Sequence, residues 1–369
     1  MSDIYLQRLA QVLVRYSLNI EKGDRLAITT TPHAAPLVRE VVREALRVGA
    51  YPEPMITLPG IEEIFLKEGS NEQLSYIPPS LRIARQDYET SLAIFAQENT
   101  QDLNGIDPAR LGVRQQAFSD LGRTFLQRGA DGTLRWCVAL FPTTAYAQDA
   151  GMSLSDFEEF VYYACFLNEE NPVARWLELS RQQERLIQWL KGKHQIHVRG
   201  LDTNLTFSIE GRPFMNGDGH FNFPDGEFST SPVENSAQGV IRYSFPTAMN
   251  GRSVEDVRLR FENGVVVEAS AAQGQDYLEK MLNLDEGARR LGEFAFGNNP
   301  HINRCTKNIL FDEKIGGTIH LALGAGILQA GGLNQSAIHW DMVCDLRKGS
   351  EIWVDGELFC KDGKFVVEF

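Results

Sequence analysis

The stretch Gly316–Leu346, GGTIHLALGAGILQAGGLNQSAIHWDMVCDL, contains two apolar, strand-like runs separated by a glycine-rich loop. It places two of the protein's seven histidines and a carboxylate where core residues are expected. In the second run, SAIHWDMV, the alternation of a strand puts His339 and Asp341 on one face and Trp340 on the other. An imidazole and a carboxylate side by side suit one metal ion, although such a pair is more often hydrogen-bonded and structural.

Three further residues stand in similar surroundings. In the run TIHLALG, His320 shares a strand face with Ala322, and the small alanine leaves room beside the ring. Glu227 follows a Pro-Asp-Gly turn, and Glu293 lies in the apolar run GEFAFG, directly after a helix that we expect to end at Gly292. An ionised glutamate among Phe and Ala is costly to bury unless it is paired or bound to a metal. Either glutamate alone is also compatible with a salt bridge to an arginine.

The N-terminal half alternates helical and strand patterns, which predicts an α/β layer domain. Helices are expected over residues 5–16 and 32–50, strands over 25–31, 51–59 and 133–144, and a helix followed by a strand over 81–98. Two more helices are expected over 153–167 and 171–192, the first opened by a Ser-x-x-Asp cap.

After Gly192 the pattern changes to short strands joined by turns of Gly, Asn and Asp. Strands are expected within 194–200, 203–211, 239–245, 257–271, 350–359 and 364–369, and one helix over 274–291. We therefore predict an N-terminal α/β domain over residues 1–190. A β-rich α+β domain over residues 191–369 is predicted to carry the metal site.

Composition excludes several classes of function. At 369 residues, with 43% hydrophobic and 23% charged residues, the chain is an ordinary globular protein long enough for two cores. A net charge of -13 disfavours nucleic acid and anionic membranes as partners, since binding there depends on Lys and Arg. The start predicts an amphipathic helix and not a signal peptide, and no run is long enough to cross a bilayer. Five scattered cysteines without a CxxC pair indicate reduced thiols and a cytoplasmic location.

Four motifs follow one another in a family-specific order: NFPDGEFSTSPVENSAQGVI (222–241), GEFAFGNNP (292–300), LFDEKIGGTIHLALG (310–324) and GGLNQSAIHWDMVCDLR (331–347). Together they resemble the metal-dependent aminopeptidases of peptidase family M29, the AmpS-, AmpT- and PepS-like thermophilic aminopeptidases. Weaker resemblance extends upstream through RWCVALFPTTAYA (135–147), so most of the chain is covered.

The resemblance places the metal ligands on Glu227, Glu293, His320, His339 and Asp341. Such a mixed set suits a two-metal hydrolytic centre, in which two divalent ions (Zn, Co, Mn or Mg) share a carboxylate and a water. It implies removal of N-terminal residues from short peptides or amino-acid amides. As a hypothesis, Glu227 or Glu293 bridges the metals. Glu293 is the better candidate for the catalytic residue that moves a proton from water to the leaving amine, although the two glutamates could exchange roles. No site for an organic cofactor is predicted.

The resemblance also implies a homodimer whose two active sites face an enclosed cavity, which would restrict substrates to short peptides. One position departs from the family pattern. An aromatic residue, commonly Tyr, follows the first ligand histidine by seven residues in the family, and Ile327 stands there in this chain. Isoleucine cannot donate a hydrogen bond to an oxyanion, and losing one such donor costs about 10²–10³ in rate.

Two alternatives stay open at this point. His320, His339 and Asp341 would also form the 2-His-1-carboxylate site of a mononuclear iron, ring-cleaving dioxygenase, a function found among relatives of the fold. The presence of both glutamates argues against it, because one iron would not require them. The other alternative is a divergent metal-binding relative with little or no peptidase activity. Glu313, in FDEKIGG, could line the site through a turn, but a salt bridge with Lys314 is its expected role.

Overall fold

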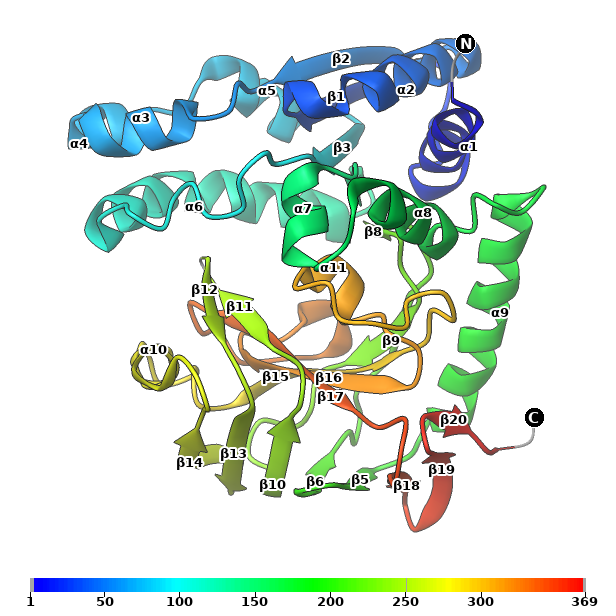
Figure 1. The fold of residues 1–369 in the computed structure, drawn as a ribbon, viewed down its shortest axis with the longest axis vertical. Helices are drawn as coiled ribbons and strands as arrows, with labels where there is room; N and C mark the ends of the chain where they lie inside the picture. The colour runs from blue at the N-terminus through cyan, green and yellow to red at the C-terminus, as the bar shows by residue number, and fades with distance from the viewer. Residues whose placement is uncertain (1–2, 250, 368–369) are drawn as a thin grey trace. The chain divides into compact units, whose positions relative to one another are not determined.

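The computed structural model describes residues 3–249 and 251–367, and its contacts divide the chain into two compact units (Figure 1). The first unit comprises Met1–Trp176 and Gly219–Pro224, and the second comprises Leu177–Asp218 and Asp225–Phe369. The change of unit falls within one helix, α9 (Pro172–Leu190). The predicted domain boundary near residue 190 stays a prediction.

The first unit is built on a five-stranded parallel sheet with the order β2-β1-β3-β4-β8. Parallel neighbours need crossover connections, and helices supply them. The strands are β1 (Arg25–Thr30), β2 (Tyr51–Ile56), β3 (Thr90–Phe95), β4 (Arg135–Leu140) and β8 (Asn222–Phe223). The helices are α1 (Ile4–Val12), η1 (Leu13–Ser17), η2 (Pro32–Ala34), α2 (Ala35–Val48), α3 (Ile61–Glu68), α4 (Asn71–Leu74), α5 (Pro79–Asp87), α6 (Pro108–Ala130), α7 (Thr144–Asp149) and α8 (Leu154–Ala164).

Capping residues explain where several of these helices begin and end. The Ser153 hydroxyl accepts a hydrogen bond from the backbone N–H of Asp156 at the start of α8, as its sequence predicts. Gly49 ends α2 in the left-handed conformation, with φ at 86°. The long helix α6 was absent from the sequence-based expectation. Because it buries only Leu121 and Phe125, its sequence carries little of the apolar periodicity that reveals a helix.

The second unit contains two antiparallel sheets. The larger has the order β14-β13-β10-β6-β5-β18-β19-β20, and the smaller has the order β17-β16-β15-β9-β7. The larger sheet consists of β5 (Gln195–Gly200), β6 (Thr203–Ser208), β10 (Gln238–Tyr243), β13 (Val257–Glu262), β14 (Val265–Ser270), β18 (Glu351–Val354), β19 (Glu357–Lys361) and β20 (Lys364–Phe365). The smaller, called the ligand sheet below, consists of β7 (Met215–Gly217), β9 (Glu227–Thr230), β15 (Leu291–Gly297), β16 (Thr318–Gly324) and β17 (His339–Asp345).

Short elements complete this unit: the ribbon of β11 (Thr247–Met249) and β12 (Arg252–Val254), and the helices α10 (Gln275–Leu282), α11 (Ile309–Asp312) and η3 (Leu328–Ala330). Two-residue turns join the hairpins of the larger sheet. Asn263-Gly264 and Asp355-Gly356 have positive φ at both positions, as type I′ turns require. The last strand was predicted within residues 364–369. The structure has β20 over Lys364–Phe365, and residues 368–369 lie outside the described residues.

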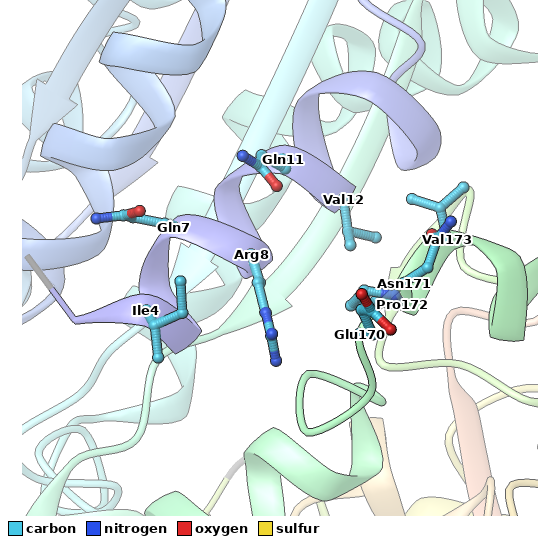
Figure 2. A pocket seen from close by; sticks show the side chains of 9 residues that line it. All are labelled: Ile4, Gln7, Arg8, Gln11, Val12, Glu170, Asn171, Pro172 and Val173. Carbon is cyan, nitrogen blue, oxygen red and sulfur yellow. The ribbon is translucent and has the colours of Figure 1, made fainter.

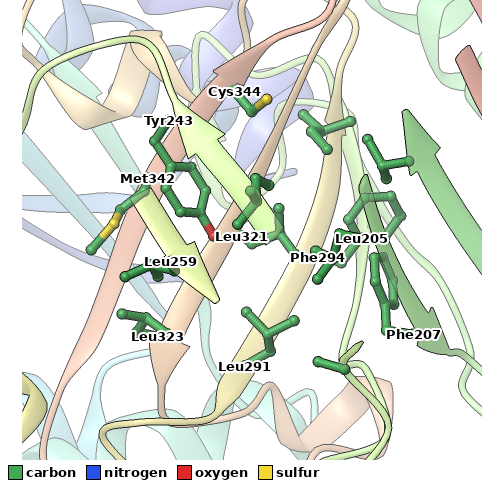
Figure 3. Packing of buried hydrophobic residues seen from close by; sticks show 14 of the residues in the cluster. Leu205, Phe207, Tyr243, Leu259, Leu291, Phe294, Leu321, Leu323, Met342 and Cys344 are labelled. Atoms are coloured by element: carbon green, nitrogen blue, oxygen red, sulfur yellow. The ribbon is translucent and has the colours of Figure 1, made fainter. Parts of the chain in front are cut away.

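The apolar face of the ligand sheet packs with side chains of the larger sheet to form the main core of the second unit (Figure 3). Phe294 of β15 meets Phe207 of β6 with ring centroids 4.8 Å apart. Leu321 and Met342, from β16 and β17, are fully buried in the same cluster. The strands that carry the predicted ligands are therefore held rigidly from behind.

The helix predicted over 274–291 is wrong in its second half. The helix α10 ends at Leu282, and Gly292 lies in strand β15. The Asp285 carboxylate accepts hydrogen bonds from Ser336 and from the backbone N–H of Ala337, which favours a turn over a continued helix. At Gly292 an added Cβ would lie 2.1 Å from a backbone oxygen of the β16–β17 connection, so the strand needs glycine there.

Two further observations bear on the predicted cellular setting. Among the described residues, no helix combines the length and the apolar character that crossing a bilayer requires. All five cysteines are free thiols in the structure, and four of them are buried.

Candidate metal centre

The structure brings the five predicted ligands together on one face of the ligand sheet, opposite its apolar face. Neighbouring strands supply them: Glu227 from β9, Glu293 from β15, His320 from β16, and His339 and Asp341 from β17. Each has at least one alanine or glycine partner across the sheet: Glu227 with Gly297, Glu293 with Ala322, His320 with Ala295, His339 with Gly324, and Asp341 with Ala322. These small partners keep the space between the ligands clear.

Three carboxylates surround the buried imidazole of His320. Its Nε2 lies 3.6 Å from Glu227 Oε2, 3.8 Å from Glu293 Oε1 and 4.0 Å from Asp341 Oδ1. These distances are too long for hydrogen bonds. Two ligand atoms that each sit about 2.0–2.2 Å from a cation lie roughly 3–4 Å apart, so the spacing matches atoms that converge on a shared ion.

The second imidazole, His339, faces the other oxygens of the same carboxylates. Its Nε2 lies 2.9 Å from Glu293 Oε2 and 3.4 Å from Asp341 Oδ2. Glu293 and Asp341 are therefore common neighbours of both imidazoles, and Glu227 is a neighbour of His320 alone.

The backbone orients both imidazoles for coordination. Nδ1 of His320 lies 3.1 Å from the Glu313 carbonyl oxygen, and Nδ1 of His339 lies 2.8 Å from the Ala325 carbonyl oxygen. Because a carbonyl only accepts hydrogen bonds, each Nδ1 carries the proton. Each Nε2 consequently presents its lone pair to the carboxylates when the imidazole is neutral, as in metal sites generally.

Two buried oxygens supply the clearest test of whether this cluster fits a cation. Glu227 Oε2 and Asp341 Oδ1 are enclosed and have no hydrogen-bond partner among the described residues. Leaving a charged carboxylate oxygen buried and unpaired is costly, and such groups are normally paired or bound to a metal. Both oxygens face Nε2 of His320, so the residues present fit a bound cation.

The structure adds one residue, Glu313, to the five predicted ligands. Side chains of Glu227, Glu313 and His320 form one group of converging ligand atoms, the Glu227 group, and those of Glu293, His339 and Asp341 form a second, the Asp341 group. Two roles were considered for Glu313 from the sequence: lining the site and forming a salt bridge with Lys314. In the structure it does both. In the sequence, the signal for this position of Glu313 was the Gly-Gly pair before β16, which predicts a turn between Glu313 and His320.

The carboxylates and imidazoles of this cluster lie close enough together to shift one another's pKa values. Burial opposes the charge of Glu293, but the neighbouring imidazoles of His320 and His339 outweigh it and hold the pKa of that carboxyl well below its usual range. Burial also disfavours protonated His339, yet Asp341 and Glu293 raise the pKa of its imidazole to about 12. A cation entering the site therefore displaces protons from the imidazoles.

The position of the missing family aromatic offers no hydroxyl. Ile327 lies just after β16, and its backbone N–H donates to the Ser231 hydroxyl at 2.9 Å. That hydroxyl donates in turn to the Gly292 carbonyl at 2.7 Å, so its proton is already used. The buried Tyr243 hydroxyl has no hydrogen-bond partner in the described part of the chain, and it belongs to the core on the opposite face of the ligand sheet (Figure 3).

A separate hollow of about 690 Å³ lies in the first unit, between α1 and the segment that begins α9 (Figure 2). It is lined by Ile4, Gln7, Arg8, Gln11, Val12, Glu170, Asn171, Pro172 and Val173. None of the predicted ligands is among these residues, and it has no histidine or cysteine. The chemistry expected from the sequence therefore belongs to the ligand sheet.

Comparisons with known proteins agree with one another. A family described as thermophilic metalloprotease (M29) matches residues 2–365. The chain is 29% identical over 395 residues to aminopeptidase T of Thermus aquaticus, covering 96% of this chain and 94% of that protein. It is 26% identical over 412 residues to aminopeptidase 2 of Geobacillus stearothermophilus, covering 97% and 95%. The structure of wild-type AmpT from Thermus thermophilus superposes with a TM-score of 0.85 at 25% identity, covering 98% and 99%.

These likenesses decide two of the sequence-based expectations. The mixed α/β architecture is confirmed by the similarity to AmpT over nearly the whole chain. The dioxygenase alternative has no support, because the matching family is described as a metalloprotease and these relatives are named aminopeptidases.

Proposed function

The chain belongs to the thermophilic metalloprotease family M29 and is a metal-dependent aminopeptidase, and we propose that its ligand sheet holds two divalent metal ions. The ligands are the five residues Glu227, Glu293, His320, His339 and Asp341, with Glu313 as a sixth. The observation that carries this proposal is the pair of buried, unpartnered oxygens of Glu227 and Asp341, which converge on Nε2 of His320.

Bound there, divalent metals would supply Lewis-acid chemistry: polarisation of the scissile carbonyl and a lowered pKa for a water near neutral pH. The chain's own residues orient the reaction. Asp341 reaches both imidazoles and would help to hold a cation beside either of them. Glu293 also lies between the imidazoles, and we assign to it the transfer of a proton from the attacking water to the leaving amine.

The substrates proposed are short peptides and amino-acid amides with a free N-terminus. The homodimer and enclosed cavity implied by the family resemblance stay predictions, as does the cytoplasmic location indicated by the cysteines. Sedimentation equilibrium of the full chain tests the first of these directly, because a monomer at micromolar concentration would contradict it.

The deciding experiment combines metal content with turnover. Protein purified without chelator should contain two divalent metals per chain and release leucine from leucine amide. Glu293→Gln should lower kcat by about 10²–10⁴-fold, the range for loss of a general acid–base group. Glu286→Gln, at an exposed turn position, is the matched control and should leave turnover unchanged. One iron per chain without release of amino acid would contradict the proposal.

A further inference from the structure

Lys314 is a buried cation inside the candidate metal centre. Its side chain has 0% exposure, and its Nζ lies 3.3 Å from Glu227 Oε1 and forms an ion pair with Glu313. A buried lysine is uncommon unless paired, and both of its partners here are proposed metal ligands. The Lys314 ammonium therefore occupies carboxylate oxygens that a bound cation would also use.

This ammonium touches only one of the two ligand groups. Both of its ion pairs are to the Glu227 group, and it has none among the described residues of the Asp341 group. With neutral imidazoles, the two carboxylates of the Glu227 group and Lys314 leave a net charge of -1, whereas the Asp341 group keeps -2. The two groups thus differ in charge although each offers two carboxylates and one imidazole.

Given the two-metal centre proposed above, we propose that Lys314 makes the two metal positions unequal. The Asp341 group takes the first cation tightly, and the Glu227 group takes the second more weakly and exchanges it more readily. Within a buried site, one unit charge a few ångströms away changes the affinity for a cation by roughly tenfold or more. Lys314 also holds one oxygen of Glu227, which leaves the unpartnered Oε2 facing His320.

The test is a titration of the metal-free full chain with Mn²⁺ alone. Calorimetry and electron paramagnetic resonance both monitor the binding. The wild type should bind two equivalents whose dissociation constants differ at least tenfold. The spectrum of a spin-coupled Mn²⁺ pair should develop only with the second equivalent.

Lys314→Met removes the competing charge and should tighten the second equivalent at least tenfold while the first changes little. A gain of affinity cannot come from a damaged fold, so it separates this role from a structural one. Lys314→Arg keeps the charge and should restore the wild-type difference. Lys348→Met, at an exposed position after β17, is the matched control.

Glu313→Gln is a second variant in case Lys314→Met does not fold. It should weaken only the second equivalent, because Glu313 belongs to the Glu227 group. Two equal equivalents in the wild type, or unchanged or weaker binding by folded Lys314→Met, would overturn the inference. Failure to bind a second metal at all would instead refute the two-metal centre on which it rests.

Discussion

The two faces of the ligand sheet use the same strands for opposite purposes. Along β16, Leu321 points into an apolar core, while its neighbour His320 points into a cluster of carboxylates. Both side chains are almost completely buried, at 0% and 1% exposure. The core face gains stability from removing apolar area from water, and the ligand face places charges out of water at a cost.

The comparison teaches that one face stabilises the other. Phe228 and Phe296 stack on the apolar face with ring centroids 4.8 Å apart, and Phe296 lies in the same strand as Glu293. Tight packing behind the sheet fixes the strands, so the ligand carboxylates cannot move apart to relieve their repulsion. A bound cation removes that repulsion, and we expect metal binding to stabilise the fold.

The largest effect should come from His320→Asn, which breaks the ligand face and leaves the core face intact. With a metal ligand lost, kcat/KM for leucine amide should fall roughly 10³-fold or more, which corresponds to about 4 kcal/mol of transition-state stabilisation. Metal content per chain should fall with it. The midpoint of urea unfolding measured with chelator present should fall less than after a change on the core face, although His320 also offsets the charge of Glu293. A larger fall would contradict the separation of the two faces.

The substitution Leu321→Ala, at the next residue, should instead lower stability and leave metal binding intact. Removing a fully buried leucine leaves a cavity and should lower the free energy of unfolding by about 2–5 kcal/mol. Urea denaturation measures this loss. The folded fraction at low temperature should still bind the wild-type number of metals. Loss of metal from that folded fraction would show that the core face sets the ligand geometry more directly than we infer.

Ala322→Val tests the small residues that separate the ligands. Ala322 is paired with both Glu293 and Asp341 and is fully buried, so two added methyl groups must displace a carboxylate or strain the strand. Such overpacking typically costs about 1–3 kcal/mol. We expect weaker metal binding in calorimetry, whereas Ala295→Gly should leave the affinity close to wild type.

The smallest effect should come from Tyr243→Phe on the core side. The Tyr243 hydroxyl is buried and has no hydrogen-bond partner in residues 3–249 and 251–367, and burial raises its pKa well above the usual range. Removing an unpaired buried hydroxyl should change the free energy of unfolding by less than about 1 kcal/mol, in the stabilising direction if at all. Thermal denaturation checks this. A clear loss of stability would reveal a hydrogen bond that a buried water supplies.

Much of this arrangement could be predicted from the sequence. The period-two alternation in SAIHWDMV put His339 and Asp341 on one face, and the structure has them there. The Asn-Gly and Asp-Gly pairs predicted hairpin turns, which follow from the positive φ that these residues tolerate. By contrast, the helix expected over 274–291 stopped at Leu282, because the carboxylate of Asp285 binds a segment some fifty residues away.

What the sequence determined by itself was local: which residues alternate, where turns fall, and which side chains are chemically able to bind a metal. Only the tertiary structure decided that Glu227 and Asp341, far apart in the chain, meet at His320, and that Lys314 lies against one ligand group alone. The physical reason is that side-chain direction follows from neighbouring backbone geometry. The order and register of strands depend instead on how two buried faces close over long chain separations.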